Sequence, residues 1–123
     1  MTIRGIRGAT TVDADQPELI LKATRELLEA ILKANKDMEP DDIASVFFTV
    51  TDDLVSTFPA QGARQMGWEL VPMICSREIP VPGSLPHVIR VLVHWNTDRN
   101  QSDISHIYLH EAVKLRPDLI GAQ

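Results

Sequence analysis

Two arginines stand where a charged side chain is costly, and they suggest what the chain could bind. Arg7 lies in an apolar, glycine-rich segment near the start of the chain, and Arg90 lies in the middle of an apolar run. A charge inside a sheet must be paired or must face a ligand, and a guanidinium suits planar contact with carboxylates. Glu78 precedes a proline-rich loop, and Tyr108 brings a phenol that needs a partner. Together these four residues suggest a pocket for a small dianion, which needs no metal, cofactor or nucleophile.

Other catalytic arrangements are poorly supported by the sequence. The segment Gly5-Ile6-Arg7-Gly8 lacks the spacing and the lysine of a phosphate-binding loop. His106 and His110 are four residues apart, but they flank a strand-like segment, which argues against a metal site. Cys75 is the single cysteine, and no local signature supplies a histidine base for it. Its sequence context favours a small buried hydrophobic residue instead.

The composition predicts one ordinary globular domain over residues 1–123. Asp and Glu number 17 against 12 Lys and Arg, and the net charge of −5 argues against general nucleic-acid binding. Pairing with the surplus acids is the alternative role for any one arginine.

One cysteine permits no intrachain disulfide. No apolar run is long enough to span a bilayer and no signal peptide is visible, so the expected location is the cytosol.

One long helix is the clearest element of secondary structure. We expect Asp15 to cap it, with Pro17 in its first turn and Glu18 three residues after the cap. Apolar residues then recur at helical spacing from Ile20 to Ala34. Shorter helical segments are predicted to open at residues 40–42, to run from 59 to about 66, and to lie over 111–115.

The remaining apolar segments predict about five strands, at residues 2–9, 44–50, 70–76, 88–96 and 107–109. Pro72 marks the third as an edge strand or a bulge, and three prolines make 79–86 a rigid surface loop. A mixed or antiparallel sheet with helices on one face fits this order best. Arg90, Leu92 and His94 share one strand face. A single long helix leaves one sheet face uncovered, and its apolar residues predict an oligomer.

The sequence resembles the monofunctional, trimeric chorismate mutases of bacteria over nearly its whole length. The opening Ile-Arg-Gly-Ile-Arg-Gly-Ala-Thr-Thr-Val (3–12) is similar to the start of that family. The similarity continues through Phe58-Pro59-Ala60, Arg64, Gly67-Trp68, Val71-Pro72, Cys75, Glu78 and Ile89-Arg90-Val91, then His106-Ile107-Tyr108-Leu109 and Leu115-Arg116-Pro117-Asp118-Leu119.

The resemblance implies a fold and a reaction. The family fold is a small α/β (α+β) domain, a mixed five-stranded sheet with one long helix and short helices. Three copies form a trimeric pseudo-α/β-barrel with active sites between subunits. The implied reaction is the Claisen rearrangement of chorismate to prephenate, in phenylalanine and tyrosine biosynthesis. It uses electrostatic and conformational catalysis without a cofactor or a metal.

The resemblance also implies a role for each site residue. Arg90 would face the ether oxygen of the substrate, Arg7 would hold a carboxylate with help from Tyr108, and Glu78 would accept a hydrogen bond from the ring hydroxyl. The other implied binding residues are Ile74 and Cys75 beside Glu78, Phe58, Ala60 and Arg64 from a neighbouring subunit, and Leu115 and Arg116 from a mobile tail that closes over the site.

Two positions depart from the family pattern, and two other functions stay open. Gln61 stands where a lysine is usual, and Ile74 stands where a threonine is usual. A trimeric module that senses an anionic metabolite without converting it is one alternative. A small trimeric imine or enamine deaminase is the other, since it also uses an interfacial arginine. The combination of Arg7, Glu78, Arg90 and Tyr108 favours the mutase over both.

Overall fold

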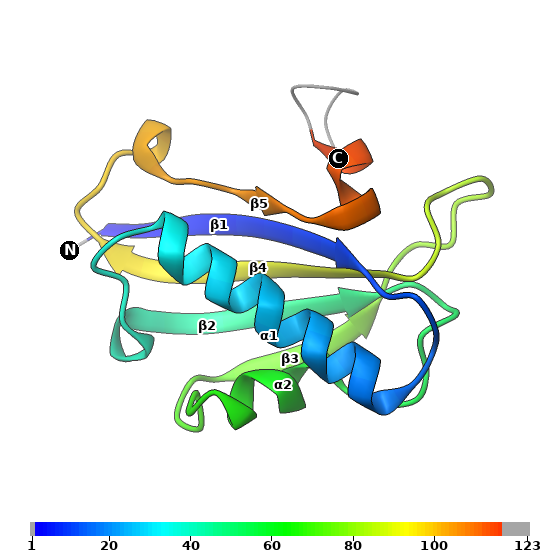
Figure 1. The fold of residues 1–123 in the computed structure, drawn as a ribbon. Coiled ribbons are helices and arrows are strands. Elements are labelled where there is room, and N and C mark those ends of the chain that lie inside the picture. The colour runs from blue at the N-terminus through cyan, green and yellow to red at the C-terminus, as the bar shows by residue number, and fades with distance from the viewer. Residues whose placement is uncertain (1, 117–123) are drawn as a thin grey trace.

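A five-stranded mixed sheet forms the body of the protein (Figure 1). The computed structural model describes residues 2–116. The strands are β1 (Thr2–Thr11), β2 (Ile43–Val50), β3 (Met73–Arg77), β4 (Val88–Thr97) and β5 (Ile107–Tyr108), in the order β3-β2-β4-β1-β5. The central strand β4 pairs antiparallel with β1 and β2, whereas the outer pairs β2/β3 and β1/β5 are parallel. The predicted mixed sheet is therefore confirmed, and β3 is an edge strand as Pro72 indicated.

Both α-helices cover the same face of the sheet. Helix α1 (Pro17–Ala34) lies across the strands, and α2 (Pro59–Gln65) packs against it (Figure 1). The predicted apolar stripe of α1 is buried, with Ile20, Leu27 and Ile31 fully inaccessible. Three short 3₁₀ segments complete the described structure: η1 (Pro40–Asp42), η2 (Gln101–Asp103) and η3 (His110–Leu115).

Alternation along β4 separates a core face from a second face. Ile89, Val91, Val93 and Trp95 are buried beneath the helices, whereas the residues between them point the other way and are half-buried. This is the pattern expected of a sheet covered on one side. Arg90 consequently stands on the face that neither α1 nor α2 covers.

Side chains of α1 pack directly over the Gly8 backbone of β1. A Cβ built on Gly8 would lie 3.0 Å from Ile31 Cδ1, 3.1 Å from Val91 Cγ1 and 3.2 Å from Leu27 Cδ1. Only glycine leaves room for those three side chains to pack over β1. The next residue back along the strand, Arg7, points to the opposite face.

Apart from shifts of one residue at other element ends, three details differ from the sequence-based prediction. Strand β1 continues to Thr11, because it pairs with β4 as far as Val88. Strand β3 begins at Met73, after Pro72 rather than around it. Asp15 does not cap α1: the N-cap is Gln16, and the Asp15 carboxylate accepts hydrogen bonds from the backbone N–H groups of Val55 and Ser56, both at 3.0 Å. Its side chain therefore links the approach to α1 with a distant loop.

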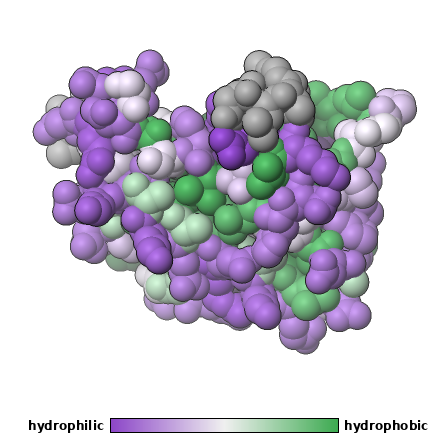
Figure 2. Space-filling model, turned by 45° about the horizontal axis from the view of Figure 1, so that its top comes forward, coloured by the Kyte–Doolittle hydropathy of each residue, from purple (hydrophilic) through white to green (hydrophobic). Residues whose placement is uncertain are grey.

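The predicted surface loop is confirmed. The segment at 79–86 is an exposed loop between β3 and β4. Hydrophobic surface gathers in patches among hydrophilic surface (Figure 2). Within residues 2–116, no helix combines the length and the apolar character needed to cross a membrane. The predicted mobile tail beyond Arg116 lies outside the described residues.

Candidate active site

The register between β1 and β4 brings the two predicted site arginines to one face. Arg7 is opposite Leu92, two residues along β4 from Arg90, and Arg90 is opposite Ala9. Diagonal neighbours of this kind lie about 7–8 Å apart and are within reach of long side chains. Both guanidinium groups therefore occupy the face away from α1, although more than half of the chain separates them in sequence.

Glu78 is held beside Arg90 by its position just after β3. Its backbone N–H donates to the carbonyl oxygen of Val50 at 2.8 Å, which extends the parallel β2/β3 pairing by one residue. Its carboxylate Oε2 lies 3.5 Å from Arg90 Nε, and both side chains are 25% exposed. The Thr49 hydroxyl donates a hydrogen bond to the same Oε2. The acid is thus fixed by two neighbours in a half-buried setting.

A cleft of about 280 Å³ joins these groups to Tyr108 on β5. Its lining combines the charged groups Arg7, Glu78 and Arg90 with the ring and aliphatic surfaces of Phe47, Leu92 and Ala9, together with Thr49 and Tyr108. A second hollow, of about 270 Å³, shares Glu78 and Arg90 and runs under the 79–86 loop. Leu115 lines that second hollow. Four of the predicted residues therefore meet in one cleft, and a fifth borders its extension.

The charge balance of the cleft favours a small dianion. Two guanidinium groups face one carboxylate, and the other lining side chains are neutral. The apolar wall beside the half-buried Arg90–Glu78 pair strengthens that ionic contact, because less water screens it than at the open surface. Among residues 2–116, no group of three side chains is arranged to hold a metal ion. The two histidines considered as ligands are engaged elsewhere, His106 with the Arg7 backbone at 2.9 Å and His110 with Glu26 at 2.8 Å.

Several predicted site residues lie away from the cleft within one chain. Phe58 precedes α2 and Ala60 and Arg64 belong to it, on the helix-covered side of the sheet; Phe58 is 68% exposed and Ala60 is buried in the core. Ile74 is 57% exposed on the uncovered face. The Cys75 side chain packs against the core cluster, so its thiol faces away from the cleft. Gln61 accepts a hydrogen bond from the Thr57 hydroxyl at 3.1 Å.

Sequence reasoning missed several residues of the cleft wall, three of which have side chains that shape the polar site. Phe47, Thr49 and Leu92 were not predicted to take part, yet all three line the cleft. The period-2 alternation of β2 places Phe47 and Thr49 on one face, and that signal is readable in the sequence. Which face of β2 meets Arg90 depends on the β2/β4 register, which pairs Thr49 with Arg90.

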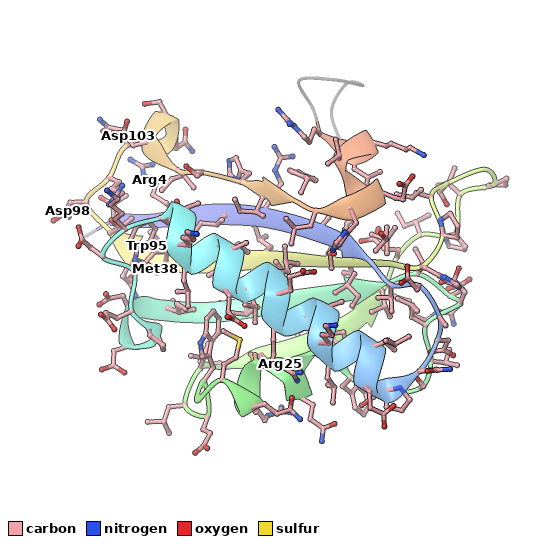
Figure 3. All side chains as sticks on the ribbon, in the orientation of Figure 1. Arg4, Arg25, Met38, Trp95, Asp98 and Asp103 are labelled. Carbon is pink, nitrogen blue, oxygen red and sulfur yellow. The ribbon has the colours of Figure 1, made fainter. Side chains whose placement is uncertain are left out.

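The arginines outside the cleft mostly serve the fold. Arg4 Nε donates to the carbonyl oxygen of Arg99 at 2.9 Å, and the Arg99 guanidinium lies 5.4 Å from the centre of the Trp95 ring. Arg25, on α1, donates a hydrogen bond to Gln65 on α2. Figure 3 shows Arg4 and Trp95 together at one end of the sheet and Arg25 beside α2. These contacts are structural but do not involve acids. The expected pairing with an acid is made by Arg77 with Asp52 at 2.8 Å and by Arg99 with Asp37 at 3.7 Å.

Comparison with known proteins identifies the family. The sequence model of chorismate mutase type I matches residues 3–119. The chain is 59% identical to chorismate mutase AroH of Thermus thermophilus over 98% of this chain and 99% of that protein. It is 46% identical to chorismate mutase AroH of Bacillus subtilis (strain 168) over 97% of this chain and 94% of that protein. A solved chorismate mutase from Clostridium thermocellum superposes with a TM-score of 0.89 at 47% identity, covering 91% of this chain and 99% of that one. With the two arginines and the acid in one cleft, these matches show that the chain belongs to the chorismate mutase type I family.

Proposed function

We propose that this protein converts chorismate to prephenate by a Claisen rearrangement, an isomerisation within one substrate molecule on the route to phenylalanine and tyrosine. The observation that carries the proposal is the meeting of Arg7, Arg90 and Glu78 on one sheet face, with Arg90 Nε 3.5 Å from Glu78 Oε2. Chorismate carries two carboxylates, an ether oxygen and a ring hydroxyl. The cleft offers two cations for the anionic groups and one acceptor for the hydroxyl.

Each polar group of the cleft has a role in this reaction. Arg7 holds a substrate carboxylate, and Tyr108 assists at that end. Glu78 accepts the hydrogen bond of the ring hydroxyl. Arg90 faces the ether oxygen, where negative charge grows as the C–O bond breaks. A cation fixed in advance stabilises that charge more in the transition state than in the ground state.

The apolar wall contributes by restricting the substrate. Phe47 and Leu92 flank the charged groups in the cleft. A chorismate molecule held at its carboxylates between such walls is confined to the compact, chair-like conformer from which the new bond forms. Neither a proton transfer nor a covalent intermediate is required. We therefore expect kcat to stay level between about pH 6 and 9.

We further propose that three copies of the chain assemble and complete each site. The uncovered sheet face exposes Phe47 by 43% and Ile74 by 57%, and Phe58 is exposed on the other side of the molecule. A neighbouring copy that brings its Phe58, Ala60 and Arg64 to the cleft would cover apolar surface on both chains. Leu115 and Arg116 then close the remaining side. We also propose a cytosolic location, in keeping with the free thiol of Cys75.

Mixing purified protein with chorismate and following the loss of its absorbance tests the activity. Turnover to prephenate supports the mutase. Binding without turnover would support a sensing module, and conversion of an imine substrate with none of chorismate would support a deaminase. For assembly, Arg64→Ala and Arg90→Ala chains are mixed after each is shown to be inactive. Activity regained after verified subunit exchange supports composite sites, and activity that stays at the single-variant level contradicts them.

A further inference from the structure

Just before β5 begins, the His106 side chain accepts a backbone N–H of β1 that would otherwise bond to a neighbouring strand. Pairing between β1 and β5 begins only at Gly8 and Ile107. The backbone N–H of Arg7 therefore lies one residue before the ladder starts. The His106 side chain supplies the missing acceptor, since its Nδ1 takes a hydrogen bond from the Arg7 N–H at 2.9 Å. The imidazole thus fixes the backbone from which the Arg7 side chain projects.

His106 is itself carried on an anchored segment. The neighbouring Ser105 is held at both of its backbone groups by the Asn35 amide: its N–H donates to Oδ1 at 2.9 Å, and its carbonyl oxygen accepts from Nδ2 at 3.0 Å. Asn35 ends α1 and is 1% exposed, and its Nδ2 also donates to the carbonyl oxygen of Ile31. A buried amide that is hydrogen-bonded through both its nitrogen and its oxygen rigidifies the backbone to which it binds. The approach to β5 is therefore fixed to α1 immediately before His106.

The hydrogen bond requires Nδ1 to be without a proton. Burial, and then the positive charge of Arg7, lower the pKa of His106 below its ordinary value of 6.5. Arg7 on β1 is the charged group that acts on the ring. The neutral Asn35 amide serves the adjoining Ser105, and the His110 ring at the start of η3 is bound to Glu26. At neutral pH, Nδ1 accordingly accepts the Arg7 N–H.

From this arrangement we propose that His106 is a positioning residue for substrate binding: it fixes the backbone of β1 at Arg7 and so aims the Arg7 guanidinium at the substrate carboxylate. This proposal rests on the proposed function, because it assigns Arg7 to the carboxylate. Nothing in it requires His106 to touch the substrate. Its contribution is the hydrogen bond to the Arg7 N–H, which lies one residue before the β1/β5 pairing begins.

Two substitutions separate positioning from simple loss of the ring. His106→Leu removes the acceptor, and His106→Asn places Oδ1 near the position of Nδ1 and keeps it. Loss of one hydrogen bond corresponds to a factor of about five in binding, so we expect His106→Leu to raise KM about fivefold with kcat changed less than about twofold. His106→Asn should stay within about twofold of the wild-type KM. His110→Leu is the matched control, since that ring contacts Glu26 and not Arg7.

A pH series gives an independent readout that does not depend on the folding of the leucine variant. Protonation of His106 removes the acceptor and adds a cation beside Arg7. The wild-type KM should therefore rise, relative to that of His106→Asn, as the pH falls below the lowered His106 pKa. The positioning role would be overturned if the ratio of the wild-type KM to the His106→Asn KM did not change with pH. It would also be overturned if the KM of His106→Leu equalled that of the wild type. A wild-type protein that does not convert chorismate at all would instead overturn the proposed function.

Discussion

Thr49 and Arg90 are opposite residues in the β2/β4 ladder, and their side chains converge on one oxygen of Glu78. The Thr49 hydroxyl donates to Oε2, and Arg90 Nε lies 3.5 Å from the same atom. A short neutral donor and a long cation therefore set the orientation of one carboxylate. The relationship joins β2, β4 and the end of β3, so the sheet register itself determines how Glu78 faces the cleft.

Removing the Thr49 hydroxyl should misorient Glu78. Valine keeps the shape of threonine but cannot donate, and a hydrogen bond to a charged group contributes about 1.5–3 kcal/mol. We expect Thr49→Val to lower kcat/KM by about tenfold or more. Thr49→Ser, which keeps the donor, should remain near wild type. Equal kcat/KM values for Thr49→Val and Thr49→Ser would show that the hydroxyl has no part in placing the acid.

Replacing Arg90 should impair turnover much more than folding. Loss of one preorganised donor to a developing oxyanion costs roughly 10²–10³ in rate, and we expect Arg90→Ala to lower kcat by at least that factor. Arg90→Lys should recover little, since a point charge cannot reproduce the planar fork. Measuring kcat beside a melting curve for each variant separates the two roles. A large fall in Tm with normal kcat in the surviving protein would make Arg90 a structural residue.

Adding a methyl group at Gly8 should destabilise the protein. The new Cβ would press on Ile31, Val91 and Leu27 at 3.0–3.2 Å, and overpacking of this kind costs about 1–3 kcal/mol. Gly5→Ala is the control in the same strand, because its Cβ would meet only Leu92 Cδ1 at an ordinary 3.4 Å. Urea unfolding of both variants measures the difference. A Gly8→Ala protein as stable as Gly5→Ala would mean that α1 shifts without cost.

The loop contact of Asp15 should make part of the stability depend on pH. Desolvation opposes ionisation of this carboxyl, but the hydrogen bonds from Ser56 and Val55 and the charge of His87 outweigh it, so the pKa of Asp15 lies below 3.8. A depressed pKa in the folded state adds stability above the unfolded value, and this is lost as the pH falls through the folded value. The Tm difference between wild type and Asp15→Ala should therefore be present at pH 7 and shrink below about pH 4. A difference that is constant with pH would contradict an ionic role.

Local sequence patterns predicted the helices and strands, and the alternation of residues along a strand predicted which side chains share a face of the sheet. The spacing of Ile20, Leu27 and Ile31 predicted the buried stripe of α1, and the residues around Arg90 predicted which side chains of β4 share its face. Both signals depend only on the geometry of one element. The alternation along β4 also predicted that the Arg90 side chain lies on the sheet face opposite the core.

Features that depend on long-range register were harder to predict. The pairing of Thr49 with Arg90 is fixed by how β2 and β4 align, which no local spacing encodes. Asp15 carries the usual pattern of a helix cap, yet its carboxylate reaches residues 55 and 56 instead, because a distant loop offers two N–H groups. No local pattern assigned a role to His106, because its hydrogen bond from the Arg7 N–H depends on where β5 begins beside β1.

The candidate cleft draws on β1, β2, β4, β5 and the end of β3, and this has a consequence for folding. Thr2 pairs with Thr97 and Thr11 with Val88, so the first strand made by the ribosome cannot close its ladder until most of the chain has followed. Sheets built from such distant pairings fold slowly. Arg7 and Arg90 come together only when that ladder closes. Recovered activity in a refolding experiment should therefore report completion of the central ladder, later than the formation of α1.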